Sequence, residues 1–345
     1  NWGTNGIVID SNGLNYQGQD DTYDIEYGTD GTALHIVYSG ATNGWIPTLD
    51  KAVTDAPKTG NTEGIFAYGI NGGAQSMSNL VSDAGVVGTD VTGVGSARRY
   101  LGACEYGEDK GIFAYGHDDL SMSNLVSNAG VVATDVTGVG TGRYDLAACT
   151  YGDDKGIFGF GRIANGTLKG VTNLVTNLGV IGTDVTAVGT ARRGVAACEY
   201  GGDKGIFGFG YDSDVASMTN LVSNVGVVAT DVTGVGTARN GLAACSYSGT
   251  KGIFGFGYDG SSDTGVTNLV SNAGVVATDV TGVGTARNGL AATQYGGGKG
   301  IFGYGTIAGG SVSSLSNLVS STGVVASDVT GVGTAREGPA ACSFN

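Results

Sequence analysis

The chain is poor in proline, in histidine and in charge. Only 3 of its 345 residues are Pro, 2 are His, and charged residues make up 14 %. So little proline beside 66 Gly excludes a collagen-like chain or a Pro-rich linker. Two His give no basis for assembling a Ser/His/Asp triad. No run of about eighteen apolar residues occurs, so we expect no membrane insertion.

The charge that is present is mostly negative, with a net value of −14 at pH 7. Nucleic-acid backbones and anionic lipid surfaces are bound by clustered Lys and Arg. We therefore expect neither partner. Hydrophobic residues reach 41 %, enough for a core, and an acidic, Gly-rich composition suits an extracellular or virion protein. The chain begins Asn-Trp-Gly, which suits a processed product or part of something longer.

One phrase of fourteen residues organises most of the chain. It reads GVVATDVTGVGTAR at residues 226–239, returns unchanged at 274–287, and has four near copies. A second marker, Gly-Ile-Phe, begins at positions 64, 111, 156, 205, 252 and 300. A fixed period near fifty residues without helical periodicity is typical of a β-propeller.

Each repeat contains four strand-like segments, which in one copy are residues 242–247, 252–257, 266–271 and 274–280. Ile, Phe and Val in the second and fourth suit half-buried strands. The small residues of the first suit a crowded inner strand. Small sheets of this size must stack side by side to bury both faces. The loop between the second and third segments is called the 2–3 loop, and the turn into the next repeat the 4–1 turn.

The two ends of the repeat region are complementary. The first repeat begins at its second strand, at residues 64–69, and the chain finishes with an unpaired first strand at Ala340–Phe344. Pairing of these two strands would complete a ring. We therefore expect an all-β chain with two domains: a small N-terminal β segment with its linker at 1–58, and a six-bladed propeller of four-stranded blades at 59–345, closed by the C-terminal strand.

The order of features within each repeat resembles the kelch repeat. An Arg (Arg239) is followed by the small-residue strand at 242–247 and a hydrophobic strand ending in Gly-Phe-Gly at 253–257. The resemblance covers residues 64–345. The Gly pair is interrupted by Phe or Tyr, and no repeat has the family's Trp. Degenerate, Gly-rich repeats of this sort also resemble ones found in phage structural proteins.

Residues 1–58 contain both Trp and none of the repeat. GIVID, TYDIEYG and ALHIVYSG alternate apolar and polar residues, as short strands do, and residues 51–60 are expected to be a linker. His-Ile-Val-Tyr-Ser-Gly at 35–40, followed by Gly44-Trp45, resembles a module of bacteriophage tail fibres and tail spikes. The resemblance implies a virion protein. Because so short a segment with few apolar side chains would be marginally stable alone, we expect it to pack on the propeller, on other copies of itself or on a partner.

Several repeated motifs are interpreted as structural. Gly-Val-Gly-Thr-Ala lacks the following helix of a dinucleotide site, so it is expected to be a turn. The repeated Asp and Arg are expected to cap turns and to bond between blades. The five Cys occupy one repeat position, where the sixth copy has Thr293. Their spacing fits no zinc site, so we expect buried thiols and no metal or cofactor.

The 2–3 loops are where the copies differ most, and all six are expected on one face with the 4–1 turns. Variable loops on a rigid scaffold commonly form binding sites. Tyr stacking and Asp hydrogen bonds would suit a sugar, although drifting loop tips and a Ca²⁺ site remain alternatives. The candidate ligand-binding residues are His117, Asp118, Asp119, Arg162, Tyr211, Asp212, Asp214, Tyr258, Asp259 and Asp263.

These observations predict a non-catalytic binding or structural protein. We expect a phage virion component, a tail fibre or spike, that contacts a host surface glycan or protein receptor. Its N-terminal segment would contact other virion proteins or form a homo-oligomer such as a trimer. A secreted lectin or adhesin is the alternative. A propeller glycan hydrolase is a weaker one, because no acidic pair stands out.

Overall fold

The computed structural model describes residues 7–9, 13–16, 25–27, 35–49 and 61–345. Its regular elements are all β-strands, so the all-β prediction is confirmed for this part of the chain. The described residues contain no helix capable of crossing a membrane. The chain divides into two compact units, Asn1–Lys58 and Thr59–Asn345. The expected linker at 51–60 lies outside the described residues.

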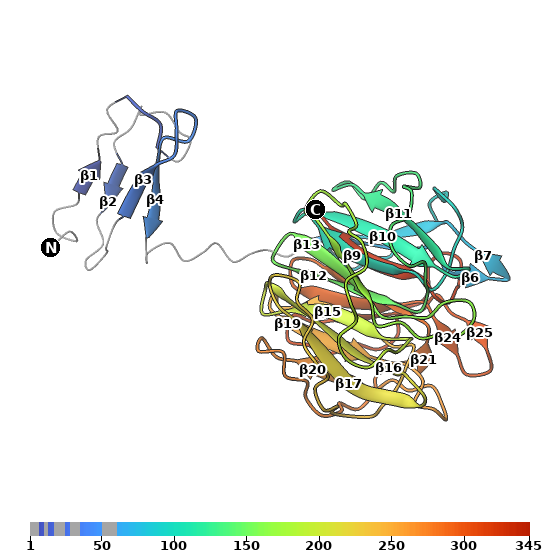
Figure 1. The fold of residues 1–345 in the computed structure, drawn as a ribbon. Helices are drawn as coiled ribbons and strands as arrows, with labels where there is room; N and C mark the ends of the chain where they lie inside the picture. Colours follow the sequence, from blue (N-terminus) through green and yellow to red (C-terminus); the bar gives the residue numbers. More distant parts are fainter. Residues whose placement is uncertain (1–6, 10–12, 17–24, 28–34, 50–60) are drawn as a thin grey trace. The chain divides into compact units, whose positions relative to one another are not determined.

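The described residues of the first unit form two antiparallel strand pairs (Figure 1). Its hairpin turn is closed by hydrogen bonds from Ser39 N to Gly44 O and from Gly44 N to Gly40 O. The ring of Tyr38 lies 5.3 Å from that of Trp45, so the aromatic residues of the hairpin pack together. The strand at Trp45–Leu49 was not anticipated from the sequence. The strands are β1 (Ile7–Ile9) with β2 (Ile25–Tyr27), and β3 (His35–Tyr38) with β4 (Trp45–Leu49).

The second unit consists mainly of six three-stranded antiparallel sheets. In each, the Gly-Ile-Phe strand lies in the middle, where Ile and Phe are fully buried. The sheets are β27 (Ala340–Phe344), β5 (Glu63–Ala67) and β8 (Ser78–Val81); β9 (Gly102–Tyr106), β10 (Lys110–Gly116) and β11 (Leu120–Val126); β12 (Ala147–Tyr151), β13 (Lys155–Gly159) and β14 (Thr172–Val175); β15 (Ala196–Tyr200), β16 (Lys204–Tyr211) and β17 (Val215–Val222); β18 (Ala243–Tyr247), β19 (Lys251–Gly255) and β20 (Thr267–Val270); and β22 (Ala291–Tyr295), β23 (Lys299–Gly303) and β26 (Ser316–Val319).

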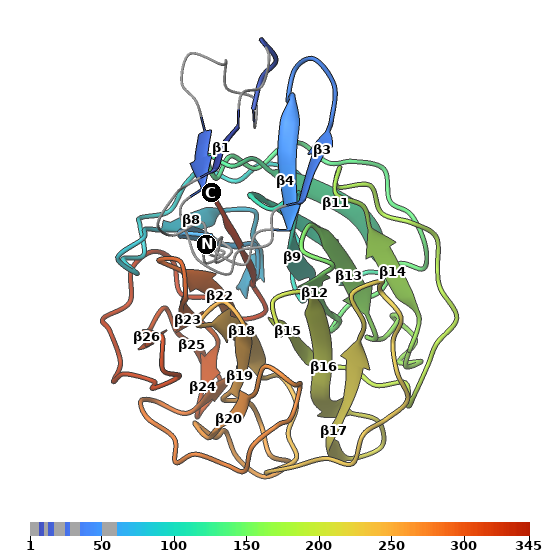
Figure 2. The same ribbon diagram turned by 90° about the vertical axis from the view of Figure 1, so that its left-hand side faces the viewer.

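The six sheets are arranged around a common centre, with their first strands innermost (Figure 2). Each first strand contacts the next, in the order β9, β12, β15, β18, β22 and β27, and β27 contacts β9. The predicted pairing of the two chain segments is confirmed, because β27 pairs with β5 in antiparallel register. Short extra strands extend two 2–3 loops: β6 (Ile70–Asn71) with β7 (Gly73–Ala74), and β24 (Thr306–Ile307) with β21 (Arg287–Asn288) and β25 (Ser311–Val312).

The expected fourth strand of each sheet is not a continuous strand. Within residues 274–280, only Val276 and Val280 form bridges to the third strand. Between these bridges the side chain of Asn268 donates a 3.0 Å hydrogen bond to the carbonyl of Ala277. A side chain thus replaces part of the backbone ladder. The segment still covers the third strand, but as a bridged chain rather than a β-strand.

The repeated Cys and Gly pack against each other between sheets. An ideal Cβ at Gly205 would lie 2.5 Å from Sγ of Cys149 in the preceding sheet, so only Gly leaves room for the sulfur. Burial raises the pKa of the Cys149 thiol. All five Cys are free and buried, and the sixth interface places Thr293 against Gly64. The predicted buried thiols are confirmed, and they fill the contact between an inner strand and the middle strand of the next sheet.

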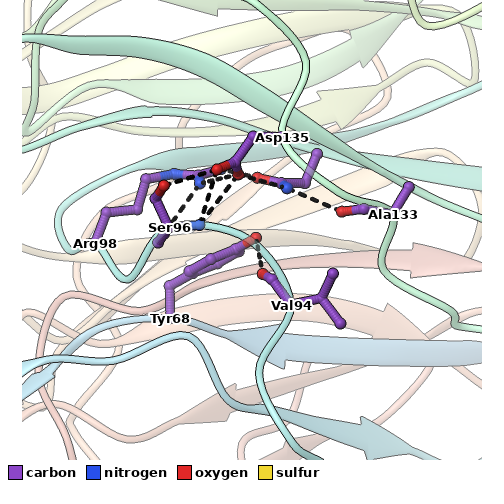
Figure 3. Close-up of polar contacts among 7 residues, drawn as sticks. Tyr68, Val94, Ser96, Arg98, Ala133 and Asp135 are labelled. Atoms are coloured by element: carbon purple, nitrogen blue, oxygen red, sulfur yellow. Dashed lines mark hydrogen bonds and ion pairs between the residues drawn. The ribbon is translucent and has the colours of Figure 1, made fainter.

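The repeated Asp links one sheet to the preceding repeat (Figure 3). Asp135 Oδ2 accepts hydrogen bonds from Ser96 N at 3.0 Å and Ser96 Oγ at 2.7 Å. Arg98 is buried, stacks over the Tyr68 ring at 4.3 Å and places NH1 3.6 Å from Asp135. The structural interpretation of the repeated Asp and Arg is therefore supported. The equivalent links are Thr141–Asp184, Thr190–Asp231, Thr237–Asp279, Thr285–Asp328 and Thr334–Asp90.

Candidate functional site

The 2–3 loops and the 4–1 turns meet on one rim of the second unit. In each sheet, the residue after the buried Arg bonds through its backbone to the residue that begins a 2–3 loop. Tyr144, for example, forms an antiparallel bridge with Arg162. This rim therefore displays six such pairs around the centre. The pairs are Arg99–His117, Tyr144–Arg162, Arg193–Tyr211, Asn240–Tyr258, Asn288–Thr306 and Glu337–Ile70.

The next residue of each 4–1 turn belongs to a ring of backbone hydrogen bonds. The N–H of Tyr100 donates to Gly338 O at 2.8 Å, and Asp145 N–H donates to Tyr100 O at 3.0 Å. The ring continues through Gly194, Gly241 and Gly289 back to Gly338. These residues also line a cavity at the centre of the rim.

Two residues of this ring have a backbone conformation that is unfavourable for their residue type. All six have positive φ, which Gly adopts freely, and four copies have Gly. Tyr100 has φ 54° and Asp145 has φ 55°. A non-Gly residue in a sparsely populated conformation costs about 1–3 kcal/mol, and such residues cluster at functional sites. Both residues with this strained backbone lie on the same rim, in two consecutive 4–1 turns.

Three consecutive sheets combine a guanidinium with a ring at the paired position. The Arg162 guanidinium lies 4.7 Å from the centre of the Tyr144 ring, and that of Arg193 lies 4.7 Å from the Tyr211 ring. Arg99 NH2 lies 3.3 Å from Nε2 of His117. The three arginines with these rings are termed the arginine crescent. The other three sheets have no arginine at the paired positions.

Asp145 holds two members of the arginine crescent. Its Oδ2 is 2.8 Å from Arg162 Nε and 3.9 Å from Arg193 NH1. The Asp145 side chain is only 12 % exposed. Burial raises the pKa of this carboxyl, and the two guanidinium groups oppose that rise without cancelling it. Asp145 is thus a positioning residue for Arg162 and Arg193.

His117 connects Arg99 to the Tyr144 ring. The His117 and Tyr144 ring centres are 4.7 Å apart. Arg99 donates to Nε2, which places the imidazole proton on Nδ1, 2.8 Å from Asp118 Oδ1. The neighbouring Asp119 accepts a 2.7 Å hydrogen bond from Ala164 N in the next 2–3 loop. Four of the predicted site residues therefore lie in or against the crescent, and Asp119 ties two loops together. They are His117, Asp118, Arg162 and Tyr211.

The remaining predicted carboxylates stabilise their own loops. Asp212 accepts hydrogen bonds from the N–H groups of Ser213 and Asp214, and Asp214 accepts one from Val215 N. These contacts leave the two carboxylates as caps of one turn. No group of three or more His, Cys, Asp or Glu suited to a metal occurs among the described residues.

The second Tyr-Asp loop behaves similarly. Asp259 accepts hydrogen bonds from Ser261 N and Ser262 N, both at 2.8 Å. Asp263 accepts a 2.6 Å bond from Asn288 Nδ2. The Tyr258 side chain is 37 % exposed, whereas Tyr211 lies under Arg193. Tyr258 thus presents an exposed ring, whereas Tyr211 is part of the arginine crescent.

Sequence reasoning missed Arg99, Tyr144, Asp145 and Arg193, because it treated the 4–1 turns as one repeated structural element. A signal was present. The two residues after the buried Arg read Arg-Tyr, Tyr-Asp and Arg-Gly in three copies, against Asn-Gly or Glu-Gly in the others. Aligning the copies at this point would have shown where the symmetry breaks.

Comparison with known proteins gives no relative from which a role could be carried over. No protein-family model matches the chain, and no curated protein is significantly similar to it.

Proposed function

We propose that residues 59–345 form a closed six-bladed β-propeller that serves as a binding scaffold. The pairing of β27 with β5 and the hydrogen-bond ring through Tyr100 support closure. A second set of backbone bonds links neighbouring hairpin turns on the opposite rim, as from Gly107 N to Asp154 O at 2.8 Å. There the bond from Asn345 N to Asp109 O joins the end of the chain to the second sheet.

The recognition surface in this proposal is the rim formed by the 2–3 loops and 4–1 turns. The observation that carries it is the concentration of charged and aromatic side chains outside the repeat pattern there, with the arginine crescent on three sheets. The opposite rim repeats one pattern, in which a Lys begins five of the six middle strands. A regular scaffold that varies on one face is the usual arrangement of a binding protein.

The contacts of the carboxylates on this rim favour a binding role over hydrolysis. Glycoside hydrolysis uses two carboxyl groups that face the scissile bond. On this rim Asp145 is paired with arginines, and Asp212 and Asp259 accept hydrogen bonds from their own loops. These contacts favour recognition without catalysis, so a non-catalytic protein remains our proposal.

We further propose that the protein is a phage virion component, a tail fibre or spike that binds a host surface glycan or receptor. The support is the tail-fibre-like segment at 35–45, whose hairpin packs Tyr38 on Trp45. Residues 1–58 would then contact other virion proteins or other copies of the chain. A secreted adhesin would use the same rim, and co-purification with virions, as opposed to free secretion, separates the two.

The full chain tests the proposed face by binding to host cells and to a glycan array. Tyr211→Ala combined with Tyr258→Ala should weaken binding, since losing an aromatic anchor costs about 2 kcal/mol, roughly thirtyfold in affinity. Asp153→Ala with Asp154→Ala, on the opposite rim, is the control and should leave binding unchanged. Loss of binding in the control but not in the Tyr variant would place recognition on the other face.

A further inference from the structure

We infer that the arginine crescent binds the anionic group of an acidic saccharide. This inference depends on the proposed binding function, because it names the class of ligand for the same rim. The shared chemistry is an oxyanion on a sugar: a carboxylate, a sulfate or a phosphate. Planar guanidinium groups match such oxyanions through two parallel hydrogen bonds.

The distribution of arginine in the chain is the first observation. Six of the nine Arg belong to the repeat, and their side chains are at most 1 % exposed. The other three are Arg99, Arg162 and Arg193. All three lie on the same rim and on consecutive sheets. In a chain of net charge −14, every arginine that the repeat does not require is thus gathered at one place.

The crescent arginines are held in a way that leaves hydrogen-bond donors for a ligand. Arg162 forms an ion pair with Asp145 through Nε and stacks on Tyr144, and its side chain is 29 % exposed. No described residue accepts a hydrogen bond from its terminal nitrogens. Arg193 is also 29 % exposed and stacks on Tyr211. Arg99 is held by the 3.3 Å contact of its NH2 with Nε2 of His117, and its Nε is buried out of a ligand's reach. Fixed planes with unused donors are the geometry that oxyanion recognition needs.

The surroundings suit a sugar rather than an isolated ion. Within the crescent the His117 ring packs against the buried Tyr144, and Tyr258 on the following sheet presents an exposed ring. Aromatic faces pack against the apolar face of a sugar. Asp118, whose side chain is 80 % exposed, can accept hydrogen bonds from sugar hydroxyls. An acidic saccharide would therefore use both the charged and the aromatic parts of the rim.

The test is a glycan array probed with the full chain, on which each carboxylated glycan is paired with its carboxyl-reduced form and each sulfated or phosphorylated glycan with its neutral form. Binding should be confined to the acidic member of the pairs. The class of acidic glycan that binds identifies the oxyanion. Arg162→Gln with Arg193→Gln should reduce binding about tenfold or more, and Arg162→Lys should retain only part of it, since Lys keeps the charge but not the planar fork.

Lys251→Gln with Lys299→Gln is the matched control, because it removes two positive charges from the opposite rim. A thermal melt of each variant shows that the fold is kept. Equal binding to acidic and neutral members would overturn this inference and leave the proposed binding function standing. Acid-dependent binding that the Arg variants do not change would also overturn it. Binding to no glycan and to no host cell would instead overturn the proposed function itself, and this inference with it.

Discussion

Thr334 Oγ1 donates a 2.6 Å hydrogen bond to Asp90 Oδ2, although the two residues are 244 positions apart in the chain. The Thr334 N–H donates to the same carboxylate at 3.0 Å. The same link joins every pair of neighbouring repeats, so Asp90 makes between the last and first repeats the contact that Asp231 makes within the series. Six equivalent carboxylates therefore tie the sheets together.

These carboxylates predict how stability depends on pH. Burial raises the pKa of Asp90, but hydrogen bonds from Thr334 and Asn79 outweigh burial and hold it below its usual 3.8. The folded pKa is lower than the unfolded one, so the stabilisation is complete above about pH 4 and is lost as the pH falls through the folded value. The free energy of unfolding in urea should stay level from pH 7 to 5 and drop below pH 4.

A variant tests whether this loss of stability comes from the repeated Asp–Thr link. Asp231→Asn removes one titrating group, so its stability should fall less steeply with acid than that of the wild type. A wild-type curve that stays level down to pH 2 would contradict the assignment, because six groups with lowered pKa values must take up protons on acid unfolding.

The contact of the last strand with the first sheet predicts a large effect at Phe344. Its side chain is fully buried, and Phe344 lies opposite Glu63 in the β27–β5 ladder. Phe344→Ala should lower the free energy of unfolding by about 3–5 kcal/mol, the usual cost of removing a buried Phe. Val324→Ala is the control: that side chain is 65 % exposed, and the change should stay within about 0.5 kcal/mol. Equal effects of the two changes would show that the last strand is not part of the core.

The packing of Gly205 on Cys149 predicts that substitutions at the two positions have coupled effects on stability. Gly205→Ala would bring Cβ against the Cys149 sulfur and should cost about 1–3 kcal/mol through overpacking. Cys149→Ala removes that sulfur. The double variant should therefore lose less stability than the two single variants added together, with a coupling of about 0.5–3 kcal/mol.

Gly73→Ala is the matched control, since no atom lies within 4 Å of the place that a Cβ would take there and the methyl group would face solvent. It should change stability by no more than about 0.5 kcal/mol. Additive effects of Gly205→Ala and Cys149→Ala in chemical denaturation would show that the two residues do not share one packing site.

The sequence was sufficient to predict the middle strand of each sheet and the pairing of the two ends of the repeat region. The Gly-Ile-Phe strand and the pairing of Ala340–Phe344 with the first sheet followed from the phase of the repeat. The prediction of a continuous fourth strand was wrong, because the Asn268 amide replaces part of the backbone ladder. Hydrophobic periodicity does not reveal this role. At the rim, Arg162 was predicted but Asp145 was not. Its importance depends on a positive φ and on two arginines from other segments, which only the folded chain brings together.

The strained position of Asp145 predicts a separation of stability from binding. Four repeats have Gly here, so Asp145→Gly should relieve the unfavourable backbone conformation and remove a buried carboxyl whose pKa is raised mainly by burial. Its melting temperature should equal or exceed that of the wild type. Asp145→Ala keeps the strain and should be less stable than Asp145→Gly by about 1 kcal/mol.

Both variants release Arg162 and Arg193 from their shared carboxylate, so both should weaken ligand binding although only one is strained. Stability gained at the expense of function is the expected behaviour of a strained binding site. Thermal melts and binding measured on the same preparations check the two halves of this prediction. An Asp145→Gly variant that bound as well as the wild type would show that the carboxylate serves the fold alone.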